Sequence, residues 1–70
     1  MNIPDNVMEE IDFMLGDIEE CNSDYLLPIL HDHGIYPDGS WLFIDDVPDD
    51  VILDIYERCF KTGIVVPFNE

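Results

Sequence analysis

Basic residues are almost missing from this 70-residue sequence, which has two Lys and Arg against 17 Asp and Glu and a formal net charge of −15. Such a surface repels phosphate groups, which argues against direct binding to DNA, RNA or anionic membranes. The sequence also has no long apolar run, because the longest, at 41–44 and 64–66, are far too short to span a bilayer. The N-terminus has no basic segment followed by an apolar run, as a signal peptide would. These absences predict a cytoplasmic protein.

Motifs of catalysis and metal binding are missing as well. The two cysteines, Cys21 and Cys59, have no CxxC or metal-ligand spacing, so we expect buried free thiols, with a disulfide as the alternative. His31 and His33 are two residues apart and would point to opposite sides of a helix, which favours an interaction with the helix dipole over a metal site. The sequence has no nucleophile elbow and no glycine-rich phosphate loop. We therefore expect no enzymatic activity, no metal and no cofactor.

Apolar residues are plentiful, at 47% of the chain, so residues 1–70 can form one compact domain with its own core. Hydrophobic periodicity predicts helices over 4–20, 24–33 and 48–61. Short apolar runs near 41–44 and 64–68 predict two strands, whose parallel or antiparallel pairing the pattern leaves open. The predicted fold class is α+β, mainly helical, with three helices packed on a short two-stranded β element.

Two stretches of the sequence resemble each other: residues 2–11 read NIPDNVMEEI, and residues 46–55 read DVPDDVILDI. In both, a proline stands where a helix would begin and acidic residues follow in its first turn, where they favour the positive end of the helix dipole. Asn2 and Asp46 are the corresponding candidates for side-chain caps. Because the two stretches diverge after the shared isoleucine, the pattern indicates two helix starts built alike rather than a duplicated module.

The acidic residues are distributed unevenly. Asp54 and Arg58, and Glu57 and Lys61, are spaced as i,i+4 ion pairs, which would commit both cations to one face of the third helix. The unpaired charge must then lie on the first helix and on the segment 38–50. Carboxylates on neighbouring helical turns are about 5–6 Å apart, comparable with phosphates along a nucleic-acid strand.

Phe13 projects from the acidic side of the first helix, where it can serve as an apolar anchor within a polar ring. The alternative is that Phe13 packs under a neighbouring loop or against a second copy of the chain. The predicted partner-binding residues are Glu9, Asp12, Phe13, Asp17, Glu19, Glu20, Asp38, Asp45 and Asp46.

In size, charge and lack of catalytic motifs, the whole chain resembles the small acidic inhibitors of phages and mobile elements, such as anti-CRISPR proteins and uracil-DNA glycosylase inhibitors. The resemblance is at the level of the class and carries no family motif. It implies an inhibitor that binds a basic, nucleic-acid-binding surface, with an anti-CRISPR protein acting on a Cas complex as the first expectation. An immunity protein or antitoxin against a basic nuclease is one alternative. A homodimeric interaction domain, with Trp41, Phe13 and Phe68 as its apolar surface, is another.

Overall fold

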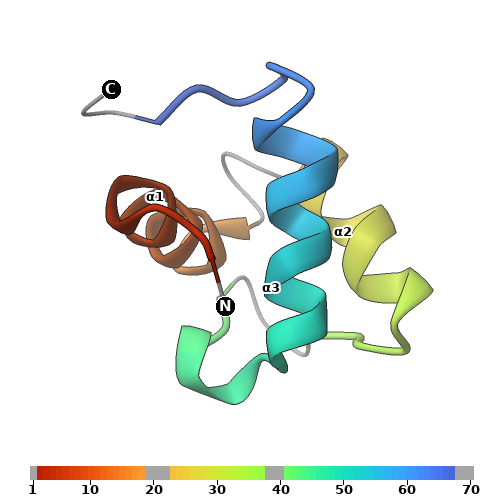
Figure 1. The fold of residues 1–70 in the computed structure, drawn as a ribbon. Helices are drawn as coiled ribbons and strands as arrows, with labels where there is room; N and C mark the ends of the chain where they lie inside the picture. Colours follow the sequence, from red (N-terminus) through yellow and green to blue (C-terminus); the bar gives the residue numbers. More distant parts are fainter. Residues whose placement is uncertain (1, 19–22, 38–40, 68–70) are drawn as a thin grey trace.

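The computed structural model describes residues 2–18, 23–37 and 41–67. In this part of the chain the elements are α1 (Asp5–Leu15), α2 (Ser23–Asp32), the 3₁₀ turn η2 (Ile44–Asp46), α3 (Asp49–Ile55) and the π-helical turn η3 (Tyr56–Phe60). Helix α3 continues into η3, and the two together run between α1 and α2 (Figure 1). None of the described helices is long and apolar enough to cross a membrane.

The two similar stretches do start helices, and they do so by the same hydrogen bonds. The carbonyl of Pro4 accepts from the N–H groups of Val7 and Met8 at 3.0 Å each. The carbonyl of Pro48 accepts from Val51 and Ile52 at 3.1 Å each. No side chain caps either helix, so the expected capping by Asn2 and Asp46 is wrong. Proline itself occupies the cap position in both, where its fixed φ suits the entry into a helix.

One apolar cluster holds the helices together. In α3 and η3, Ile55 is fully buried and Val51, Ile52 and Cys59 are nearly so. From α1 and α2 this cluster receives Val7, Ile11, Met14, Leu15, Leu26, Ile29 and Leu30, with Ile18 and Val47 from the connecting segments. Every buried residue of the cluster is apolar, so packing is the main contribution to stability here.

The expected two-stranded β element is wrong: no strand occurs in the ranges that the structure describes, and the protein is mainly helical. The N–H of Leu42, in the first expected strand, donates to the carbonyl of Leu15 at 2.7 Å. In the second, the N–H of Val65 donates to the carbonyl of Cys59 at 2.9 Å. Both apolar segments thus bond to the end of a nearby helix rather than to each other. Phe68, the last residue of the second expected strand, lies outside the described residues.

The helices also end earlier than the periodicity predicted. Helix α1 stops at Leu15, with Gly16 at its C-cap; residues 19 and 20, which the predicted helix included, lie outside the described part of the chain. Glycine lowers helix propensity by about 1 kcal/mol relative to alanine, enough to favour a turn where no packing opposes it. The third helix changes from α to π geometry at Tyr56 and ends before Gly63, whose φ of +80° suits glycine.

Candidate protein-binding surface

The exposed side of α1 is the first part of the candidate surface. Asp5, Glu9 and Asp12 are exposed along it, opposite the buried residues of the same helix. Phe13 also lies on this side and is 64% exposed. At 3.6 residues per turn, Asp12 lies closest to Leu15 around the circumference of α1, Glu9 lies farther from it and Phe13 lies farthest.

The segment 41–46 forms the second part and lies against α1. Its attachment is the hydrogen bond from the N–H of Leu42 to the carbonyl of Leu15, the last residue of α1. The turn η2 packs against α1 as well. Asp45 and Asp46 of η2 are exposed. Acids far apart in sequence are therefore carried by two elements in contact.

Just before η2 in the chain, the segment exposes two aromatic side chains. The rings of Trp41 and Phe43 meet edge to face, with their centroids 4.8 Å apart and their planes at 69°. Both remain largely exposed, at 53% for Trp41 and 63% for Phe43. We call the set formed by the exposed acids of α1 and η2 and these two rings the acidic–aromatic surface; its members are Asp5, Glu9, Asp12, Trp41, Phe43, Asp45 and Asp46.

Both cations of the chain lie in η3 or just after it, outside this surface. Arg58 donates from Nε to Asp54 Oδ1 and from Nη1 to Asp32 Oδ2, each at 2.8 Å. The hydrogen bond to Asp32 is the largest cause of the raised pKa of Arg58, followed by the charge of Asp54. The predicted pairing of Asp54 with Arg58 is confirmed, and the contact with Asp32 ties α2 to the third helix.

Lys61 does not form the predicted ion pair with Glu57. Its ammonium group lies over the ring of Tyr56, 5.2 Å from the centroid. A cation held over an aromatic ring gains about 0.5–1 kcal/mol at an exposed site. Within the described part of the chain, Arg58 and Lys61 thus each interact with residues of α2, α3 or η3, and not with the acids of α1 or η2.

The histidines have separate partners. His33 Nε2 is 2.8 Å from Asp54 Oδ2, and the ring of His31 stacks on Tyr36 with centroids 4.7 Å apart. Among the residues that the structure describes, no three His, Cys, Asp or Glu side chains are grouped as ligands for a metal ion.

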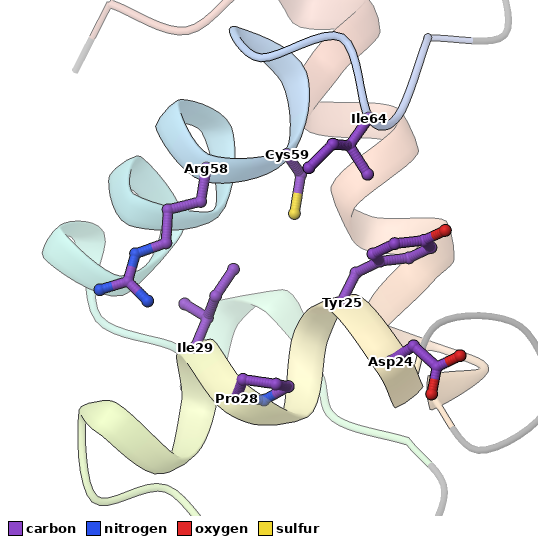
Figure 2. A pocket seen from close by; sticks show the side chains of 7 residues that line it. All are labelled: Asp24, Tyr25, Pro28, Ile29, Arg58, Cys59 and Ile64. Carbon is purple, nitrogen blue, oxygen red and sulfur yellow. The ribbon is translucent and has the colours of Figure 1, made fainter.

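A shallow cavity of about 230 Å³ lies between α2 and η3 (Figure 2). Arg58 stands on one side of it and Tyr25 on the other, and the sulfur of Cys59 lies between them. Burial is the largest cause of the raised pKa of the Cys59 thiol; the charge of Arg58 opposes it, and the charge of Asp54 adds a smaller rise. A thiol held protonated in this way is a poor nucleophile. The full lining is Asp24, Tyr25, Pro28, Ile29, Arg58, Cys59 and Ile64.

The predicted partner-binding residues fall into three groups. Five of them are exposed on two elements in contact: Glu9, Asp12 and Phe13 on α1, with Asp45 and Asp46 on η2. Asp17 is half-buried in the turn after α1 and has an interaction of its own. Glu19, Glu20 and Asp38 lie outside the described residues.

The Trp41–Phe43 pair was not among the predicted partner-binding residues. The signal was the alternation within Trp-Leu-Phe-Ile, which places residues 41 and 43 on one side of an extended chain and residues 42 and 44 on the other. Leu42 and Ile44 pack against the core, as that alternation requires.

Comparison of the chain with known protein families, characterised proteins and solved structures found no match.

Proposed function

We propose that this protein is a non-catalytic inhibitor that binds and blocks the basic, nucleic-acid-binding surface of a larger cytoplasmic protein. The first partner class is a Cas effector or surveillance complex, which would make the protein an anti-CRISPR protein. The observation that carries the proposal is the position of the cations: both are engaged at or beside η3, so the exposed acids of α1 and η2 have no Lys or Arg on their own elements.

The physical basis is electrostatic complementarity. Carboxylates without neighbouring cations produce a negative field that attracts a Lys- and Arg-rich groove. This attraction speeds association, and the same field repels acidic partners. The interaction is screened by salt, since the Debye length falls from about 10 Å at 0.1 M to about 3 Å at 1 M. An inhibitor of this kind competes with nucleic acid for one surface and needs no chemistry of its own.

The test is a competition assay with purified, guide-loaded Cas complexes, both single-protein nucleases and multisubunit surveillance complexes. Binding of labelled target DNA is measured by gel shift, with and without this protein, at several salt concentrations. We expect DNA binding by at least one complex to be lost as the protein is added, with inhibition weakening as salt rises. No inhibition and no binding across the set would refute the proposal.

Matched charge reversals locate the surface. The variant Glu9→Lys/Asp12→Lys alters the acidic side of α1, and Asp50→Lys/Glu57→Lys alters exposed acids on the third helix. Both change the net charge by the same amount. We expect the first to weaken inhibition at least tenfold and the second to change it by less than about threefold, with helicity retained in both by circular dichroism. Equal effects of the two would show that net charge alone, and not the α1 side, determines binding.

A further inference from the structure

The Trp41–Phe43 pair adds information that charge alone does not give. Two large aromatic side chains in contact with each other would normally be buried, because each can remove a large apolar area from water. Here both remain more than half exposed, beside the acids of η2. Exposed apolar side chains that lie together, unlike single ones, are a feature of interaction sites.

The pair is held in place by its neighbours in the sequence. The backbone of Leu42, which stands between the two rings, is bonded to the end of α1. The side chains of Leu42 and Ile44 pack against the core on the side opposite the rings. The rings are therefore presented outward by an anchored segment, and ordering them on binding costs little entropy.

We infer that the partner surface is a groove for single-stranded nucleic acid, in which Trp41 and Phe43 take the positions of unstacked bases and the carboxylates take those of phosphates. The inference rests on the proposed function and specifies its partner. Grooves for single strands combine basic residues along the backbone path with aromatic side chains on which bases stack. Duplex-binding surfaces contact phosphates and groove edges, because paired bases hide their faces. A surface with carboxylates alone would suit either, and the exposed rings favour the first.

The test uses the same guide-loaded Cas complexes with two fluorescein-labelled competitors, a single-stranded oligonucleotide and a duplex of the same length. We expect the protein to displace the single strand from any complex that it inhibits. Trp41→Ala and Phe43→Ala should each raise the concentration needed for displacement about tenfold, the usual scale for losing one stacking contact. Tyr36→Ala is the matched control, because this exposed tyrosine also stacks on another ring but lies outside the acidic–aromatic surface.

A direct readout comes from Trp41, the only tryptophan in the chain. Incorporation of 5-fluorotryptophan gives one ¹⁹F resonance, which should shift and broaden on binding and recover when excess single strand is added. Urea denaturation of each variant distinguishes loss of contact from loss of folding.

Three outcomes would overturn the inference while leaving the proposed function standing: inhibition that survives both aromatic substitutions, an unshifted ¹⁹F resonance in the complex, or displacement of duplex alone. If no complex is bound at all, the proposed function fails and the inference fails with it.

Discussion

Added salt should stabilise this protein strongly, because folding brings its negative charges together. The formal net charge is −15 and the radius of gyration of the Cα atoms is 10.9 Å. Side chains included, the charges lie on a sphere about 17 Å in radius, against about 33 Å for the unfolded chain. With Coulomb's law and Debye screening, the self-repulsion of the folded state falls from about 10 kcal/mol at 0.1 M salt to about 4 kcal/mol at 1 M.

The unfolded chain gains less from screening, since its repulsion falls only from about 3 to about 1 kcal/mol over the same range. The free energy of unfolding should therefore rise by about 4 kcal/mol between 0.1 M and 1 M salt. Urea is the denaturant to use, because it is uncharged. At a slope of about 1 kcal/mol per M for a chain of this size, the midpoint should rise by about 4 M.

The control is the charge dependence of the effect. Self-repulsion scales with the square of the net charge, so the less acidic variant Asp50→Lys/Glu57→Lys should gain about half as much from salt. NaCl and KCl should act alike. A urea midpoint that is unchanged or lower at high salt would refute the reasoning.

Two further predictions concern the third helix. Ile55→Ala should lower the free energy of unfolding by about 2–5 kcal/mol, because Ile55 is fully buried. Leu53→Ala, at a site 40% exposed, should lower it by about 1 kcal/mol or less. Urea denaturation measures both variants, and equal losses would contradict the burial described. In a Cys21→Ser background, the raised pKa of Cys59 keeps its thiolate scarce, so alkylation by iodoacetamide at pH 8 should be much slower in the native protein than in urea. Because the folded state favours the protonated thiol, the contribution of Cys59 to stability is present below the ordinary thiol pKa and lost as pH rises above it; labelling equally fast in both states would exclude a buried thiol.

The positions of the helices followed from local rules that act within a few residues. Pro4 and Pro48 open α1 and α3 with the same hydrogen bonds, and the buried residues of α1, which are Val7, Ile11, Met14 and Leu15, recur at the helical spacing that predicted this helix. The exposed acids and Phe13 on the other side follow from the same period. The pairing of Asp54 with Arg58 was also readable, since both partners lie on one helix.

Contacts between distant segments were decided only by the tertiary structure. The run Trp41–Ile44 has the composition of a strand, and its side chains do alternate. A strand forms only when its backbone pairs with a second strand, and here the N–H of Leu42 bonds to the carbonyl of Leu15 at the end of α1 instead. The contact of Asp32 with Arg58 likewise joins residues from two helices, which a spacing rule cannot supply.

The sequence by itself determined the excess of negative charge, the helix starts and the acidic side of α1, because composition and helical period are local properties. The tertiary structure decided that η2 packs against α1 and that Trp41 and Phe43 stand exposed just before η2 in the chain. The physical reason is a contact between distant segments: the N–H of Leu42 bonds to the carbonyl of Leu15, and Leu42 and Ile44 pack against the core, which leaves the alternate residues Trp41 and Phe43 exposed.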